Sequence, residues 1–169
     1  HCAQFDKAEL NALEVTPEEI REAVSQVEPE FLDILREAAE NIRSFHSRQA
    51  RNSFIIADKP GIVLGQKVTP IEKVGVYVPG GTAAYPSTVL MDTIPAKIAG
   101  CPQLVMVTPP GRDGKVNPVI LAAADLAGVD RIFKVGGAQA IAALAYGTES
   151  IPRVDKIVGP GNAFVAEAK

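Results

Sequence analysis

The sequence of 169 residues has no tryptophan, two cysteines and two histidines, and aromatic residues make up 5% of it. Cys2 and Cys101 lie far apart and form no C-x-x-C pair, so neither a disulfide framework nor a zinc ribbon is indicated. The net charge of -3 provides no basic surface for a nucleic-acid backbone. Because no apolar stretch is long enough to cross a bilayer and no basic-then-apolar leader begins the chain, we expect a soluble, cytoplasmic protein without a membrane partner.

Apolar residues are abundant and mostly aliphatic, and they make up 47% of the chain. This length and composition are enough for one globular domain with part of a second. The sequence begins at His1 without a methionine and stops at Lys169 inside a helical pattern. We therefore expect a chain that is incomplete at both ends, and we assign no chemical role to His1.

The first part of the chain, 1–73, has the pattern of a helical arm followed by a β-hairpin. The run from Thr16 to Glu19 contains a capping box with proline at the first helical position. A second helix is predicted from Pro29 to about Arg51, and a hairpin from Ser53 to Ile71 around a Lys59-Pro60-Gly61 turn. The second helix carries one apolar stripe, formed by Phe31, Leu35, Ala38, Ile42 and Phe45. We expect 1–73 to belong to a domain whose remainder is missing from this sequence.

From residue 74 to residue 169 short apolar strands alternate with helical stretches, which is the pattern of βαβ units. The predicted strands are Val74–Val78, Gln103–Thr108, Arg131–Val135 and Lys156–Val158. The predicted helices are Ser87–Ala99, Pro118–Ala127 and Ala138–Ala145. Pro95 should break or kink the first of these helices. The sequence therefore predicts an α/β fold with a Rossmann-like parallel sheet and alternating helices.

Three apolar runs end in glycine-rich corners, Val74–Gly81, Ile132–Gly147 and Lys156–Asn162. In a parallel sheet such corners share the carboxyl edge, where bare peptide N–H groups and helix N-termini can meet an anionic ligand. The dinucleotide fingerprint G-x-G-x-x-G is absent, since GPGNAF contains only half of it. A tight turn explains any single corner, so composition alone indicates no more than a nucleotide or phosphate site.

Several segments resemble histidinol dehydrogenase: VGVYVPGGTAAYPSTVLMDTIPAKIAGC, VGGAQAIAALAYGTESIPRVDKIVGPGNAFVAEAK, LGQKVTPIEK and FHSRQ. The resemblance runs over nearly the whole chain and is most specific from Val135 to Lys169. Histidinol dehydrogenases are zinc-dependent homodimeric enzymes of histidine biosynthesis, which oxidise L-histidinol to L-histidine through the aldehyde and reduce two NAD molecules. The resemblance implies this activity, with NAD and zinc as cofactors, for the parent protein.

The resemblance places the NAD contacts of the family on Tyr77, Gln139 and Asn162. Tyr77 can offer a ring face to a base or ribose, although a core aromatic residue fits the same pattern. Gln139 either presents its amide to ribose or nicotinamide groups or is a solvated first-turn side chain. Asn162 either bonds the cofactor or caps the last helix. These alternatives stay open on the sequence alone.

No catalytic residue and no metal ligand is expected within this chain. In the family, zinc is held by a Gln, two His and an Asp, and an adjacent Glu-His pair transfers protons; the resemblance places all of them beyond Lys169. We interpret His46 as a packed or half-exposed helical residue, because one histidine does not make a zinc site. Cys101 is interpreted as a small buried side chain rather than a nucleophile. The chain alone is therefore expected to be inactive.

The favoured interpretation is that the chain is part of a homodimeric histidinol dehydrogenase, and two alternative functions remain open. One is a stand-alone nucleotide-binding module without catalysis. The other is a structural or dimerisation fragment in which the stripe from Phe31 to Phe45 pairs with another subunit. This last alternative arises because no earlier apolar element of the chain is large enough to cover the stripe.

Overall fold

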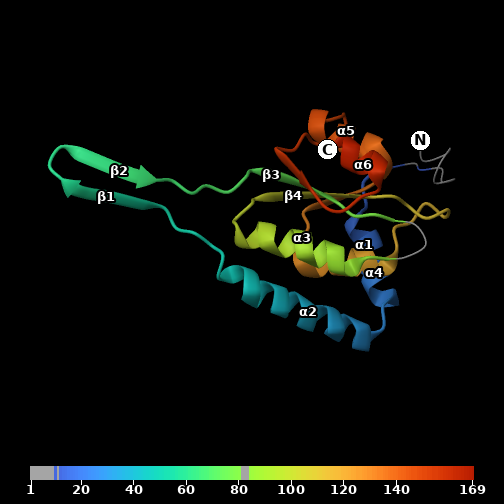
Figure 1. Ribbon diagram of the computed structural model, residues 1–169. Coiled ribbons are helices and arrows are strands. Elements are labelled where there is room, and N and C mark those ends of the chain that lie inside the picture. The colour runs from blue at the N-terminus through green and yellow to red at the C-terminus, as the bar shows by residue number, and fades with distance from the viewer. Residues whose placement is uncertain (1–9, 11, 81–83) are drawn as a thin grey trace.

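The computed structural model describes Leu10, residues 12–80 and residues 84–169 (Figure 1). Its fold is α/β, with a parallel sheet and alternating helices, as the sequence predicts. In chain order the elements are α1 (Pro17–Gln26), α2 (Pro29–Ser47), β1 (Phe54–Lys59), β2 (Ile62–Gln66), β3 (Lys73–Tyr77), α3 (Pro86–Ile98), β4 (Gln103–Thr108), α4 (Pro118–Ala127), β5 (Arg131–Lys134), α5 (Gly137–Tyr146), β6 (Lys156–Val158) and α6 (Ala163–Ala168). The predicted strands are all present, with ends that differ by at most one residue.

The main sheet has four parallel strands in the order β5-β4-β3-β6. The chain proceeds from β3 outward to β4 and β5, and then returns to place β6 on the other side of β3. The strand order therefore reverses between β3 and β6, which is the topological switch point of the fold. In open α/β sheets, ligands bind outside the carboxyl ends of the strands at such a point. Tyr77 ends β3 and Val158 ends β6, so these two residues mark the switch point.

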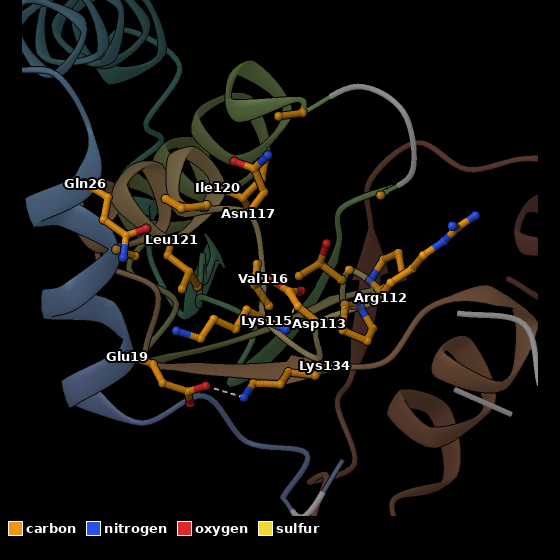
Figure 2. Close-up of a pocket in the computed structure, with 18 of the residues that line it drawn as sticks. Glu19, Gln26, Arg112, Asp113, Lys115, Val116, Asn117, Ile120, Leu121 and Lys134 are labelled. Atoms are coloured by element: carbon orange, nitrogen blue, oxygen red, sulfur yellow. Dashed lines mark hydrogen bonds and ion pairs between the residues drawn. The ribbon is translucent and has the colours of Figure 1, made fainter. Parts of the chain in front are cut away.

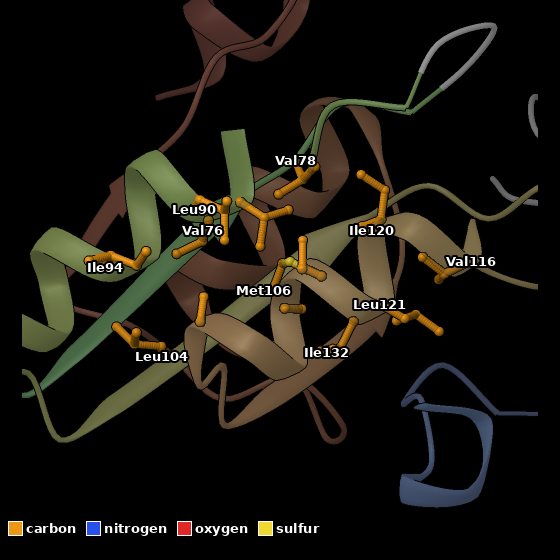
Figure 3. Packing of buried hydrophobic residues seen from close by; sticks show 14 of the residues in the cluster. Val76, Val78, Leu90, Ile94, Leu104, Met106, Val116, Ile120, Leu121 and Ile132 are labelled. Carbon is orange, nitrogen blue, oxygen red and sulfur yellow. The ribbon is translucent and has the colours of Figure 1, made fainter. Parts of the chain in front are cut away.

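Helices cover both faces of this sheet (Figure 1). One face buries Val76, Leu104, Met106 and Ile132 against α3 and α4, with α1 and α2 packed outside them (Figure 3). The other face packs against α5 and α6 through the alternate residues Tyr77, Val105, Val107 and Phe133. Right-handed crossovers on opposite sides of β3 account for this change of face.

The start of α1 confirms the predicted capping box. The Glu19 amide donates to Thr16 Oγ1 at 3.2 Å, and the Thr16 amide donates to the Glu19 carboxylate at 2.9 Å. Just before α1 the chain lies along the outer edge of β5, where the Val15 amide donates to the Ile132 carbonyl at 2.9 Å. This short antiparallel bridge covers backbone groups that an edge strand would otherwise expose.

The apolar stripe of α2 packs on α3, an element that follows it in the sequence. Leu35 is 4% exposed and Ala39 is 1% exposed, whereas Phe45 at the end of the stripe is 64% exposed. α2 ends at Ser47, before the predicted Arg51. The dimerisation alternative is therefore not supported along most of the stripe, because the chain covers it with its own later helix.

Pro95 lies inside α3 without interrupting it, so the break predicted at this residue is wrong, while the alternative of a kink stays a prediction. The residue stands in the last turn of the helix, and the Ala99 amide still donates to the Pro95 carbonyl at 2.9 Å. Because Pro95 has no N–H, α3 loses only the hydrogen bond that this residue would donate to the Met91 carbonyl. Packing of α3 on α2 and α4 offsets this loss. Within the described ranges, no helix combines the length and the apolar character that crossing a membrane requires.

The predicted hairpin forms from β1 and β2, with Phe54 opposite Gln66. Figure 1 shows that it projects away from the rest of the molecule. Both strands are apolar and every residue in them is exposed, including Ile55 and Val63. A two-stranded hairpin has little stability by itself in water. The described residues therefore leave apolar side chains uncovered on both faces of the hairpin.

Candidate functional site

Tyr77 lies at the centre of the carboxyl edge, as the last residue of β3. Its ring is 4% exposed, in the apolar cluster between the sheet and α5. Its hydroxyl oxygen accepts a hydrogen bond from the Gly137 amide at 3.1 Å. The Lys169 ammonium lies 5.8 Å from the centre of the ring. Tyr77 is thus a core aromatic residue whose hydroxyl reaches the edge, where its proton remains available for donation.

Gln139 lies in the first turn of α5 and is half-buried. Its side-chain amide nitrogen donates to the Gly136 carbonyl. The backbone amides of Ala138 and Gln139 precede the first intrahelical hydrogen bond, and they have no acceptor among the described residues. Counting the described residues alone, the N-terminus of α5 therefore presents two N–H donors without an acceptor at the carboxyl edge, a favourable position for an anionic group.

Asn162 is the N-cap of α6, and its side chain is exposed. Its Oδ1 atom accepts a hydrogen bond from the Val165 amide at 3.1 Å. The side-chain nitrogen has no recorded partner in the part of the chain that the structure describes. The capping role is therefore present, and it leaves the nitrogen of the same side chain free to donate to a ligand.

The corners after β3, β5 and β6 meet around Tyr77. Gly159 has a φ of +114°, and a Cβ atom added to it would lie 2.1 Å from the Tyr77 carbonyl oxygen. The corner after β6 therefore lies directly against the end of β3, at a distance that only glycine permits. The Gly137 amide approaches Tyr77 from the corner after β5. The structure thus brings the regions of Tyr77, Gln139 and Asn162 to one edge, while their role in binding NAD stays a prediction.

A cavity of about 690 Å³ opens at the same edge, on the α4 side of the sheet (Figure 2). It is bounded by α1, by the loop 109–117 that follows β4, and by the first turn of α4. Pro109 separates this cavity from the α5 corner. A Cβ atom added to Gly80 would lie 2.4 Å from the Pro109 ring, and one added to Gly136 would lie 2.6 Å from the same ring. The cavity and the Gln139 corner therefore share the Pro109 ring as a wall.

Two ion pairs cross the cavity from α1, and Figure 2 shows the one between Glu19 and Lys134. The Lys134 ammonium bonds the Glu19 carboxylate, and the Lys115 ammonium lies 3.0 Å from the Glu22 carboxylate. Burial opposes the ionisation of Glu19, but hydrogen bonds from Lys134 and from the Thr16 amide outweigh it and lower its pKa. The hydrogen bond to Glu22 raises the pKa of Lys115. The lowered pKa of Glu19 favours its carboxylate and the raised pKa of Lys115 favours its ammonium. The two pairs fasten α1 to the carboxyl edge of the sheet.

This cavity was not predicted from the sequence. The corner after β4, TPPGRDG, follows a buried strand and contains two prolines and two glycines, which is a turn signal that could have been included with the other three. The contribution of α1 had no local signal, because Glu19 reaches Lys134 across 115 residues of sequence.

His46 and Cys101, for which the sequence indicates no chemical role, occupy structural positions. His46 is half-exposed on α2, with Nδ1 2.7 Å from Gln49 Oε1, and Cys101 is buried. Among the residues that the structure describes, no group of three or more His, Cys, Asp or Glu side chains could hold a metal ion. His1 and Cys2 lie outside the described residues.

Comparison with known proteins identifies the family. The family model for histidinol dehydrogenase matches residues 1–169. The histidinol dehydrogenase of Clostridium acetobutylicum is 61% identical over 169 residues, which are 100% of this chain and 39% of that protein. The histidinol dehydrogenase of Methanosarcina mazei is 58% identical over 170 residues, with the same two coverages. The crystal structure of histidinol dehydrogenase from Elizabethkingia anophelis superposes with a TM-score of 0.94 at 45% identity, over 99% of this chain and 39% of that one. The chain thus spans about two fifths of the length of these relatives, and it belongs to the histidinol dehydrogenase family.

Proposed function

We propose that the full-length protein is a histidinol dehydrogenase, a cytoplasmic enzyme of histidine biosynthesis that oxidises L-histidinol to L-histidine through the aldehyde. The observation that carries this proposal is the family match over all 169 residues, which includes the edge residues Tyr77, Gln139 and Asn162. Since the chain spans 39% of the length of its relatives, the activity is assigned to the complete protein and not to this part of it.

The carboxyl edge has the features that a dinucleotide requires. Tyr77 and the β6 corner flank the topological switch point, across which dinucleotides bind in folds of this class. The free amides of Ala138 and Gln139 are placed to donate to the pyrophosphate. The unpaired side-chain nitrogen of Asn162 and the hydroxyl of Tyr77 are available to ribose or amide groups. These residues fit NAD, and we assign its binding to them.

When bound, NAD supplies the acceptor for a hydride from the substrate carbinol. The residues of this chain bind and orient the cofactor, so that the reacting atoms meet in a productive geometry. The described residues do not fit a zinc ion, because they contain no suitable group of ligands. We therefore assign zinc binding and the proton transfers to the part of the protein outside this chain. The described residues are given no role in either.

We further propose that residue 73 marks a division between two domains. The hairpin β1–β2 belongs to a second domain that the rest of the full-length protein completes, because its apolar faces are uncovered in the described part of the chain. The complete enzyme is proposed to be a homodimer. Sedimentation equilibrium of the full-length protein should give twice the subunit mass, and a monomer would contradict the homodimer.

The test of function uses the full-length protein and its Gln139→Ala variant. We expect histidinol-dependent formation of NADH by the wild type, and an increase of at least tenfold in the KM for NAD in the variant with zinc content unchanged. Gln49→Ala, just beyond the C-terminal end of α2, is the matched control and should leave the KM as it is. NAD binding without any oxidation of histidinol would instead favour a binding module, and unchanged cofactor kinetics in Gln139→Ala would contradict the assigned site.

A further inference from the structure

The corner after β6 has little backbone hydrogen bonding to hold it in place. Among the described residues, Gly159, Pro160 and Gly161 make no backbone–backbone hydrogen bond, and Pro160 has no N–H to donate. Glycine on both sides of Pro160 adds conformational freedom to the backbone. Other contacts must therefore fix this corner, and with it the position of Asn162 at its end.

Lys169, the residue after α6, reaches back to the start of this corner. Its ammonium donates to the Gly159 carbonyl, ten residues earlier in the chain. The same ammonium lies 5.8 Å from the centre of the Tyr77 ring. A hydrogen bond from a charged donor is stronger than a neutral one, and an aromatic ring face attracts a cation. Lys169 thus joins α6 to the ends of β3 and β6.

A second charge acts on this ammonium from α3, which covers the face of the sheet opposite to α6 (Figure 1). Among the described residues, the Asp92 carboxylate on α3 is attracted by one charge, that of Lys169, and Lys169 is attracted by Asp92 alone. The two groups form no direct ion pair, and the buried Oδ2 atom of Asp92 has no hydrogen-bond partner in the described ranges. Their attraction favours an ammonium held at the Gly159 carbonyl over one released to solvent.

Both charges lie where their surroundings disfavour them. Burial raises the pKa of Asp92 and lowers the pKa of Lys169, in each case against the attraction of the other charge. A neutral side chain at position 92 would avoid the desolvation of a carboxylate. Charged groups that lower stability are concentrated where a protein positions its chemistry. The arrangement therefore indicates a role at the switch point other than stability.

We propose that Lys169 is a positioning residue of the enzyme, which fixes the corner after β6 with the help of Asp92 and so sets the position of Asn162 before the cofactor binds. Neither Lys169 nor Asp92 is assigned a contact with the cofactor or the substrate. A corner that is already ordered loses less conformational freedom on binding, which raises affinity. The proposal rests on the proposed function, since it takes the contact of Asn162 with NAD as given.

The test measures the steady-state kinetics of the full-length protein at varied NAD and at varied histidinol. Lys169→Met removes the ammonium and keeps an unbranched side chain. We expect the KM for NAD to rise about tenfold, as the loss of a charged hydrogen bond predicts, and the KM for histidinol to change less than about twofold. Lys169→Arg keeps a cationic donor and should restore most of the affinity for NAD. Lys156→Met, at an exposed position on β6, is the matched control and should change neither KM.

Asp92→Asn keeps the shape of the side chain and removes its charge. We expect it to raise the KM for NAD about threefold, as the loss of one attraction between charges predicts, while it raises the melting temperature at pH 7. A purely structural role would move affinity and stability in the same direction, so the opposite signs distinguish positioning from structure. Because this variant is expected to fold at least as well as the wild type, it also serves if Lys169→Met fails to fold.

The outcomes separate this inference from the function on which it rests. An unchanged KM for NAD in Lys169→Met, with Gln139→Ala still impaired, would overturn the positioning role and leave the cofactor edge intact. An equal rise of both KM values in Lys169→Met, or no recovery in Lys169→Arg, would also overturn it, since either would show a general loss of structure. An unchanged KM in Asp92→Asn would overturn the contribution of Asp92. A wild-type protein that forms no NADH from histidinol would overturn the proposed function itself.

Discussion

The hydroxyl oxygen of Tyr77 at the end of β3 accepts a hydrogen bond from the amide of Gly137, which opens α5, at 3.1 Å. Gly137 follows β5, a strand that β4 separates from β3 in the sheet. The bond ties the central strand to the first turn of α5, and it leaves the next two amides of that helix free. One side chain thus sets the position of the helix end to which we assign the pyrophosphate.

Replacement of Tyr77 by phenylalanine should loosen this helix end. The variant leaves the half-buried Gly137 amide without its acceptor, which costs about 1–2 kcal/mol of unfolding free energy. We expect weaker NAD binding as well, because the α5 amides lose their fixed position. Denaturant unfolding and NAD titration of the full-length protein measure both effects. The matched control is Tyr146→Phe, in which the hydroxyl is lost from an exposed ring; equal effects of the two variants would contradict the role of the bond.

Gly159→Ala should be among the most damaging small substitutions at the edge. A Cβ atom there would lie 2.1 Å from the Tyr77 carbonyl oxygen, so the corner after β6 must move. We expect a loss of at least about 3 kcal/mol in unfolding free energy, together with weaker NAD binding. Gly61→Ala is the control, because Gly61 also has a positive φ, +76°, but open space around it, and the substitution should cost only about 1 kcal/mol. Similar costs for the two variants would show that the close approach is absent.

Substitutions of Asn162 can separate its cap from its assigned cofactor contact. Asn162→Asp keeps an oxygen that caps α6 and replaces the free nitrogen, so stability should be retained while NAD binds at least tenfold more weakly. Asn162→Ala removes both groups and should also lower the unfolding free energy by about 1 kcal/mol. Thermal unfolding and NAD titration of the two variants provide the comparison. Wild-type NAD affinity in Asn162→Asp would restrict the residue to capping.

Asp92 on α3 should make the stability of the protein depend on pH. Burial raises the pKa of Asp92, against the opposing charge of Lys169, and its Oδ2 atom has no hydrogen-bond partner among the described residues. A raised folded-state pKa means that the protonated form is favoured by folding, so the residue destabilises the fold once the pH exceeds the ordinary pKa of aspartate.

Asp92→Asn should therefore raise the melting temperature at pH 7, and this gain should shrink as the pH falls and Asp92 itself becomes protonated. Asp125→Asn, which removes the charge of an exposed carboxylate on α4, is the matched control. An equal gain in melting temperature at pH 7 in the two variants would contradict the role of burial. A lower melting temperature for Asp92→Asn at pH 7 would show instead that the ionised carboxylate is stabilising.

Much of the fold was predictable because its signals are local. The strands are short apolar runs, the α1 capping box lies within four residues, and parallel pairing alone places the three glycine corners at one edge. The effect of Pro95 was misjudged because helix packing decides whether a proline in a last turn interrupts a helix. The cover over the α2 stripe and the wall that α1 contributes to the cavity depend on contacts between distant segments, for which no local pattern exists.

The central claim is that the edge around Tyr77 binds NAD, and a crystal structure of the full-length protein with NAD tests it most directly. The account predicts density for the cofactor within hydrogen-bond distance of the Gln139 and Asn162 side chains, with the pyrophosphate at the α5 amides. A cofactor bound away from the switch point between β3 and β6 would contradict it.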